Sequence, residues 1–219
     1  MNMFSDKDHF NKATVIVSNK DAQDVITLEP PGLDGGLPLM QALRNRKSVH
    51  SFSPTEVSDK QVSELLWAAN GINRHISFKG KEGMRTAPSA KNHQEIEIYV
   101  FLVSGIYLYD AVGHRLLLVQ AGDHRKDCGM QVFFADVPLA LCLVANFSKM
   151  GKYDEKKRAF YSGIDAGYVS QNIYLYCASE GLATTACGLI DRKGLYRLLK
   201  LDDAKAIISH PVGWPKNPA

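Results

Sequence analysis

The spacing of apolar residues predicts helices in the first third of the chain. Between Val62 and Ala69, apolar side chains recur at i, i+3, i+4 and i+7, which is the spacing of one buried helical face. Ser58 is a favourable N-cap for this helix, and Asn70-Gly71 is a favourable end. An earlier and shorter apolar face predicts a helix over residues 38–46.

The rest of the chain predicts strands, turns and a few more helices. Residues 95–103 alternate apolar and polar side chains and then become fully apolar, which is typical of a strand that enters a core. Residues 106–109 and 115–119 flank a turn and predict a hairpin. The other predicted elements are a helix over 123–135, a buried strand over 139–145, a short helix over 195–199, a strand over 206–209 and a closing tail, HPVGWPKNP. This mixture is typical of an α+β fold.

The segment from residue 162 to residue 180 is the most informative part of the pattern. It reads as a helix with almost no polar face, including Ile164, Val169 and Ile173. A helix that is apolar nearly all round must be buried nearly all round. We therefore expect it at the centre of the domain or in a subunit interface. Gly181 is the residue expected to end it.

Length and composition predict one globular domain. The chain has 219 residues, of which 45% are hydrophobic, so it can bury a sizeable core. Residues 1–25 are polar and aperiodic and predict a flexible tail, and the domain is expected over residues 26–219. There is no internal repeat.

Charge, cysteine spacing and apolar run lengths exclude several functional classes. The net charge of +3 is spread along the chain and does not predict nucleic-acid binding. Cys128, Cys142, Cys177 and Cys187 form no CxxC pair, and no histidine lies at metal-ligand spacing from them, so we expect reduced thiols and no metal site. No apolar run is long enough for a membrane span and no secretory signal is visible, so a cytoplasmic location is predicted.

Separated segments carry side chains suited to a flat, anionic ligand. Arg46, Lys47 and His50 place three donors beside Ser48 after the first predicted helix. Cations are favoured at a helix C-terminus in any case, but these could also hold a phosphate and the edge of a heterocycle. Glycine-rich dinucleotide loops, Walker-type phosphate loops, GxSxG elbows and HExxH motifs are absent from the sequence.

The other segments have ordinary structural explanations beside the functional one. Pro88, Ser89, Ala90 and Asn92 are typical turn residues, yet small residues beside an amide also let a flat ring lie against the backbone. Residues 165–172 belong to the apolar helix and are explained mainly by packing. At Cys187-Gly188, a glycine near a strand end permits close approach of a ligand face.

Together, in this order and spacing, these segments resemble the nitroreductase-like family of FMN-dependent oxidoreductases. RKSVHSF resembles the family's early R-R/H-S-x-R/K-x-F segment, and PSAKNHQ is similar to its P-S-A/S-x-N-x-Q turn. DAGYVSQNIYLYCASEGL resembles its long central helix, and HPVGWP resembles its closing G-x-P. The resemblance covers residues 25–216 and is closest to the SagB-type dehydrogenase branch, because LLWAANGINR and GIYLYDAVGHRL are similar to segments of that branch.

The resemblance implies a fold, a cofactor and an oligomeric state. The fold would be an α+β nitroreductase-like α/β sandwich, with a central, mostly antiparallel sheet flanked by helices and a long buried helix at a homodimer interface. FMN would lie in that interface. The FMN contacts implied by the resemblance are Arg46, Lys47, Ser48 and His50 from one subunit, Pro88, Ser89, Ala90 and Asn92 from the other, Cys187 and Gly188 near the reactive edge, and Lys216 at the phosphate. His50 stands where the family usually has Arg or Lys, and Lys216 replaces a late Arg.

The resemblance also implies a reaction. Hydride would pass from NADH or NADPH to FMN and then, in a ping-pong cycle, to a small organic acceptor such as a nitroaromatic or a quinone. No side chain is obligatory as an acid or base, because the cofactor carries the chemistry. The alternatives are a SagB-type dehydrogenase that oxidises a ring in a modified peptide, and a flavin-binding protein without turnover.

Overall fold

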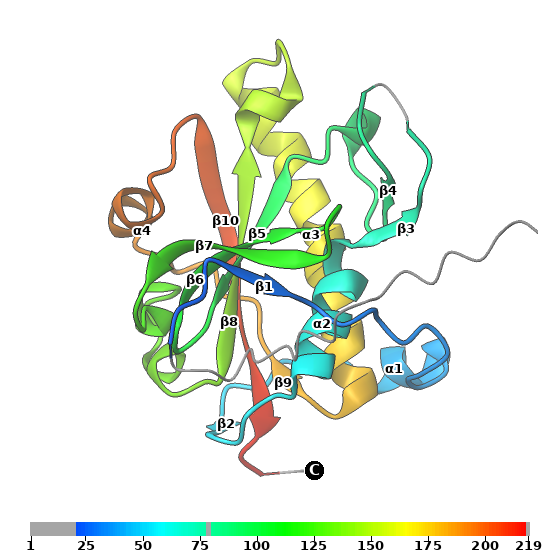
Figure 1. Ribbon diagram of the computed structural model, residues 1–219, viewed down its shortest axis with the longest axis vertical. Helices are drawn as coiled ribbons and strands as arrows, with labels where there is room; N and C mark the ends of the chain where they lie inside the picture. The colour runs from blue at the N-terminus through cyan, green and yellow to red at the C-terminus, as the bar shows by residue number, and fades with distance from the viewer. Residues whose placement is uncertain (1–20, 78–79, 218–219) are drawn as a thin grey trace, which may run out of the picture.

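An antiparallel sheet forms the centre of the fold in the computed structural model, which describes residues 21–77 and 80–217 (Figure 1). Its strand order is β1-β7-β6-β5-β8-β10-β2, with β9 also paired to β10. The bounds are β1 Val25–Thr27, β2 Phe52–Ser53, β5 Ile96–Phe101, β6 Gly105–Asp110, β7 Arg115–Ala121, β8 Leu139–Asn146, β9 Ala183–Thr184 and β10 Ala204–Pro215. Two further strands, β3 (Ile72–Arg74) and β4 (Met84–Arg85), pair with each other.

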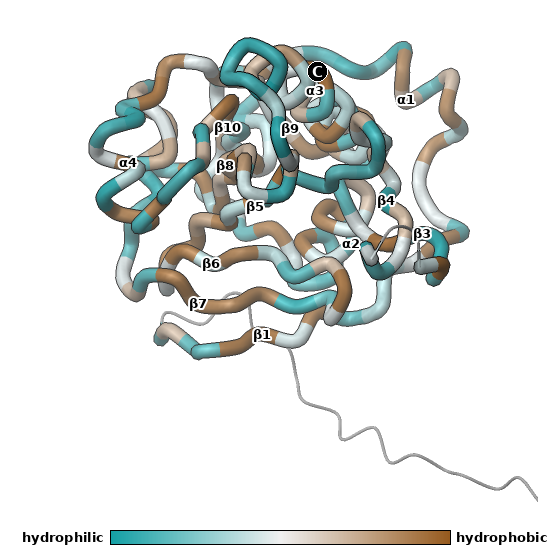
Figure 2. Tube along the Cα trace, turned by 90° about the horizontal axis from the view of Figure 1, so that it is seen from above, coloured by the Kyte–Doolittle hydropathy of each residue, from teal (hydrophilic) through white to brown (hydrophobic). Residues whose placement is uncertain are grey.

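Helices cover both faces of this sheet, and alternation along the strands builds a core on each side (Figures 1 and 2). The α-helices are α1 Leu39–Asn45, α2 Asp59–Asn70, α3 Glu155–Glu180 and α4 Arg192–Leu199. On one face, α2 and α3 pack against inward residues such as Val100 and Leu141. On the other face, α4 and Phe134 pack against Phe101 and Cys142. The predicted fold class, a mostly antiparallel sheet flanked by helices, is confirmed.

The helix predicted from its cap and apolar stripe is α2. Ser58 Oγ accepts a hydrogen bond from Gln61 N (3.2 Å), and Gln61 Oε1 accepts one from Ser58 N (3.2 Å). This reciprocal capping box satisfies two backbone donors at the helix start. Leu65, Leu66 and Ala69 are fully buried, so the stripe faces the core as predicted.

Two predicted elements differ from the structure. The helix expected over residues 123–135 is instead a pair of short 3-10 turns, Arg125–Asp127 and Val132–Ala135. Gly129 lies between them, and a Cβ there would meet the Phe134 ring at 2.2 Å, so the chain folds back too tightly for a helix. The prediction of a closing tail is also wrong, because residues 210–215 continue β10, which pairs with β8 through Val212.

The long helix α3 begins earlier than predicted and is only partly covered in the single chain. Gly181 ends it with φ at 73°, the left-handed conformation expected of a glycine in that place. Ala166, Val169 and Ile173 are buried in the core. Phe160, Ile164 and Tyr168, on another face, remain 64%, 40% and 47% exposed, so burial all round is not achieved by this chain alone.

The predicted N-terminal tail falls mainly outside the described residues. The structure describes the chain from residue 21, and Val25 already belongs to β1, at the edge of the sheet. In the described part of the chain, no helix has both the length and the apolar character needed to cross a membrane.

Candidate functional site

The segment that follows α1 lies beside β9 and beside the C-terminal end of β10. Val49 N donates to Thr184 O (3.0 Å), and Lys216 N donates to Ser51 O (3.1 Å). β2 then pairs with the end of β10. Residues 46–52, which we call the basic arm, are thereby fixed beside β9 and the residues that follow it.

Tyr174 of α3 joins the basic arm to the segment after β9. The backbone N–H of Ala186 donates to its hydroxyl oxygen (2.8 Å), and the hydroxyl shares a second hydrogen bond with Ser48 Oγ (2.9 Å). The Arg46 guanidinium lies 5.3 Å from the centre of the Tyr174 ring, within cation–π range. One side chain therefore orients Arg46, Ser48 and Ala186 together.

Behind Tyr174 lies a buried histidine that no sequence argument indicated. His210 Nε2 lies 2.8 Å from Ser170 Oγ, and its Nδ1 lies 3.1 Å from Thr184 Oγ1. Its ring packs edge-on against the Tyr174 ring, with centroids 5.4 Å apart. Burial lowers the pKa of His210 to about 3, so the imidazole is neutral at physiological pH.

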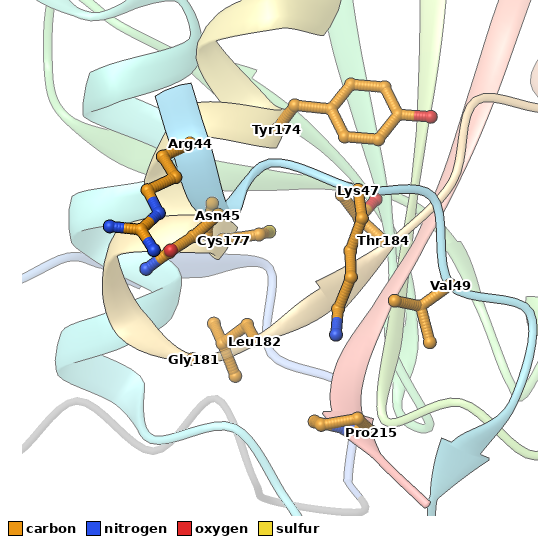
Figure 3. Close-up of a pocket in the computed structure, with 11 residues that line it drawn as sticks. Arg44, Asn45, Lys47, Val49, Tyr174, Cys177, Gly181, Leu182, Thr184 and Pro215 are labelled. Carbon is orange, nitrogen blue, oxygen red and sulfur yellow. The ribbon is translucent and has the colours of Figure 1, made fainter. Parts of the chain in front are cut away.

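A cavity of about 530 Å³ opens beside the basic arm (Figure 3). Among the described residues, its wall contains the cations Arg44 and Lys47 and no carboxylate side chain. In Figure 3 the Lys47 side chain extends across the cavity toward Pro215. The other lining residues are Asn45, Val49, Tyr174, Cys177, Ala178, Gly181, Leu182 and Thr184. The charge of this wall favours an anionic ligand.

The remaining predicted residues of this group border the arm. His50 Nε2 lies 3.3 Å from Thr185 Oγ1, and the His50 ring faces Phe133 at a centroid distance of 6.3 Å. Cys187 is buried, and burial raises the pKa of its thiol to about 11, so it is not a reactive thiolate. A Cβ at Gly188 would meet nothing within 4 Å, which leaves open space beside that backbone.

The second predicted group, which consists of Pro88, Ser89, Ala90 and Asn92, lies elsewhere in the same chain. Ala90 N donates to Asp165 Oδ2 (2.9 Å), so the turn with Pro88, Ser89 and Asn92 is tied to α3 at residue 165. The basic arm is tied to α3 at Tyr174, nine residues later. At a rise of 1.5 Å per residue, the two attachment points are about 14 Å apart along the helix.

Sequence reasoning missed Tyr174, Thr185 and His210. Tyr174 was assigned to helix packing with its apolar neighbours, although a tyrosine hydroxyl in a largely buried helix needs a hydrogen-bond partner. That need was the available signal. Among the described residues, no cluster of three or more His, Cys, Asp or Glu side chains could hold a metal ion, and all four cysteines are free thiols.

Comparison with known proteins identifies the family. The model of the nitroreductase family matches residues 43–214. A crystal structure of a nitroreductase-family protein from Ralstonia eutropha JMP134 is 40% identical, with a TM-score of 0.81 over 89% of this chain and 91% of that one. The chain belongs to the nitroreductase family.

Two more distant solved structures share the fold. The microcin synthetase complex McbBCD of E. coli, solved with truncated pro-MccB17 bound, contains a chain that is 18% identical with a TM-score of 0.66, over 87% of this chain and 78% of that one. The NADPH:FMN oxidoreductase of Vibrio harveyi, solved with NAD+, is 15% identical with a TM-score of 0.60, over 82% and 70% of the two chains. The resemblance to the nitroreductase family found in the sequence is thus confirmed, and the protein is an oxidoreductase by family.

Proposed function

We propose that this nitroreductase-family protein is an FMN-dependent oxidoreductase that transfers hydride from NADH or NADPH to a small organic acceptor. The observation that carries the proposal is the basic arm, in which Tyr174 orients Arg46 and Ser48 beside a cation-lined cavity. Charged donors and a hydroxyl suit a phosphate and a ribityl chain. The Vibrio harveyi protein of the same fold is named for FMN and NADPH, which supports the same cofactor and donor here.

The side chains have distinct roles in this proposal. Arg46, Ser48 and Lys216 bind the phosphate and ribityl part of the ligand, and Lys47 and His50 face the ring edge on which negative charge develops. Open space at Gly188 admits the flat ring against the backbone. FMN, when bound, accepts and donates the hydride, so the protein orients the reactants, tunes the electrostatics and excludes competing reactions.

We infer further that the working form is a homodimer. Phe160, Ile164 and Tyr168 form an exposed apolar face on α3, and large apolar patches on a soluble chain typically mark a partner surface. Gly163 and Gly167 lie on the same stretch, and a Cβ on either would meet nothing within 4 Å, so the single chain does not require glycine there. Pairing of two α3 helices would bring the basic arm of one chain to the 88–92 turn of its partner.

The test is the visible absorption spectrum of purified protein supplied with FMN, before and after anaerobic addition of NADH or NADPH. We expect flavin bands that bleach with one of the two nucleotides. Flavin bands that persist with both nucleotides would contradict the reductase function, but they would still show that the protein binds flavin. If no flavin binds at any FMN concentration, the cofactor assignment and its contact residues are wrong together.

The second candidate is the SagB-type dehydrogenase, which would oxidise a ring in a modified peptide. It is favoured by the LLWAANGINR and GIYLYDAVGHRL phrases and by the fold shared with McbBCD. Persistent flavin bands in the presence of both nucleotides, together with genes for a precursor peptide and a cyclising enzyme beside this one, would favour it. A flavin-binding protein without turnover would hold FMN and reduce no acceptor.

Replacing Tyr174 with phenylalanine should weaken FMN binding by about tenfold, which corresponds to the loss of roughly one hydrogen bond. The ring that supports Arg46 remains, but Ser48 and the Ala186 N–H lose their shared partner. Fluorescence titration with FMN and with riboflavin measures this. We expect riboflavin, which lacks the phosphate, to be affected less.

The matched control is Tyr196→Phe, because Tyr196 is a half-buried tyrosine on α4, away from the basic arm. Its FMN affinity should equal that of the unmodified protein. If Tyr174→Phe also binds FMN with unchanged affinity, Tyr174 does not organise the site.

A further inference from the structure

The turn that precedes β5 is held in an unfavourable backbone conformation. Lys91, Asn92 and Gln94 have φ values of 52°, 58° and 51°. For residues with a Cβ, the left-handed region costs roughly 1–2 kcal/mol each. Such a turn persists only when surrounding contacts hold it, and its shape decides where Ser89, Ala90 and Asn92 lie.

Two sets of contacts hold this turn. In the first set, Gln94 N donates to Ser89 Oγ inside the turn (3.0 Å). The Gln94 side chain also joins the turn to the segment before it, because it accepts from Arg85 Nε (3.1 Å) and donates to Gly83 O (2.9 Å). The second contact runs to α3, where Asp165 Oδ2 accepts from Ala90 N. Asp165 is only 3% exposed, so this carboxylate lies in the interior.

Directly after the turn, Glu95 is completely buried against Asp165. Its relative exposure is 0%, and neither of its carboxyl oxygens accepts a hydrogen bond from another residue in the described part of the chain. Two ionised carboxylates in contact in a dry interior repel each other strongly. A proton on Glu95 removes the repulsion and supplies the missing donor, which then bonds to Asp165. The pKa of Glu95 is raised to about 7, mainly by burial and in addition by contact with Asp165, while its own backbone N–H and the charge of Lys149 oppose the rise.

The charged groups around Glu95 do not neutralise it. Lys149 Nζ is paired with Glu97 Oε1 at 2.7 Å. Arg85 is held by Gln94 and by the Asn70 carbonyl oxygen, at 3.0 Å. On the turn itself, Lys91 is exposed and lies over the Tyr153 ring. His93 lies two residues before Glu95 in the chain, and its buried Nε2 has no hydrogen-bond partner among the described residues.

We propose that Glu95 is a positioning residue of the flavin site, whose proton, shared with Asp165, keeps the 88–94 turn in its binding shape. This inference rests on the proposed FMN function. When Glu95 gives its proton to solvent, two adjacent carboxylates repel, the Asp165 bond to Ala90 N loosens, and the strained turn relaxes. Flavin retention then depends on the protonation of a side chain that does not touch the flavin.

The test is the FMN dissociation constant of the unmodified protein and of Glu95→Gln between pH 5.5 and 8.5. The unmodified protein should bind FMN about tenfold more weakly at pH 8.5 than at pH 5.5, which corresponds to about one hydrogen bond. The glutamine amide cannot ionise and still donates to Asp165, so Glu95→Gln should bind with the same affinity, within about twofold, at every pH. Glu97→Gln, two residues along, is the matched control and should keep the pH dependence.

A second readout needs no flavin. Because the folded-state pKa of Glu95 is raised above its unfolded value, its contribution to stability is complete below about pH 4.5 and is lost as pH rises through about 7. The melting temperature of the unmodified protein, relative to Glu95→Gln, should therefore fall over that range. A constant difference would overturn proton sharing, and a pH-independent FMN affinity in the unmodified protein would overturn the link to the turn.

The two proposals fail separately. If FMN binds at no pH, the flavin function is wrong, and the melting comparison still decides whether Glu95 and Asp165 share a proton. If Glu95→Gln does not fold, Asp165→Asn takes its place. Its amide oxygen can accept from Ala90 N and its NH2 can donate to ionised Glu95, so no pair of carboxylates remains and FMN affinity should lose its pH dependence. A pH dependence equal to that of the unmodified protein would contradict the proposal.

Discussion

Replacing Ile164 with glutamate should produce a folded monomer that has lost most of its affinity for FMN. Ile164 is 40% exposed at the middle of the apolar face of α3, so a charge there is tolerated in the single chain. In a homodimer the same carboxylate would be buried without a partner, which costs several kcal/mol. Each site would then lose the 88–92 turn of the other subunit. At about 1 kcal/mol for each of two or three hydrogen bonds, FMN affinity should fall roughly a hundredfold.

Sedimentation velocity gives the oligomeric state, and the flavin-to-protein absorbance ratio gives the occupancy. The control is Val112→Glu, since Val112 is equally apolar and 48% exposed but lies in the turn after β6, away from α3. This variant should remain a dimer with full FMN. A dimeric Ile164→Glu protein would contradict the assigned interface. A monomer that retains FMN at full affinity would show that one chain is sufficient for the site.

Acid should unfold this protein chiefly through His210. The pKa of His210 is lowered to about 3 in the folded state by burial, from an ordinary value of 6.5. Its contribution to stability is therefore complete above about pH 6.5 and is lost as pH falls toward 3, because the unfolded chain takes up the proton first. At about 1.4 kcal/mol per pKa unit, the loss between pH 7 and pH 4 is about 3 kcal/mol, a large share of a typical folding free energy.

Urea unfolding at pH 7, 5.5 and 4 measures this loss. His210→Gln should be less stable at pH 7, because Ser170 and Thr184 lose a well-placed partner. It should nevertheless lose about 3 kcal/mol less than the unmodified protein on going to pH 4. Glu95 titrates in the opposite sense in both proteins and cancels in the comparison. His75→Gln, at an exposed histidine, should follow the unmodified protein. Equal acid sensitivity of His210→Gln and the unmodified protein would contradict this account.

The sequence was sufficient wherever structure depends on neighbouring residues. The Ser58 cap and the stripe below it define α2, because capping and one-sided burial are encoded within a few turns of helix. Gly181 ends α3 for an equally local reason. The ordered set of motifs was also sufficient to identify the family, since it spans nearly the whole chain.

Local pattern was misleading where packing against distant residues decided the outcome. The segment HPVGWPKNP was predicted to be a closing tail, and it contains Pro211 and Pro215, which cannot donate in a sheet ladder. Yet β10 continues through both, since pairing with β8, β9 and β2 supplies the remaining hydrogen bonds. The predicted helix over 123–135 failed because Gly129 is pressed against Phe134, a contact that periodicity does not reveal.

The sequence by itself determined the fold class, the main helices and strands and the family, because these follow from periodicity, caps and motif order. It also supplied the candidate residues, as segments scattered along the chain. The family resemblance already assigned these segments to two subunits, and the tertiary structure showed that they attach to α3 at two places, Tyr174 and Asp165. The tertiary structure alone brought His210 behind Tyr174 and Glu95 against Asp165. The physical reason is that a hydrogen bond, a buried proton or a lowered pKa depends on which groups meet in space, and groups such as Ser48 and Tyr174 are 126 residues apart in sequence.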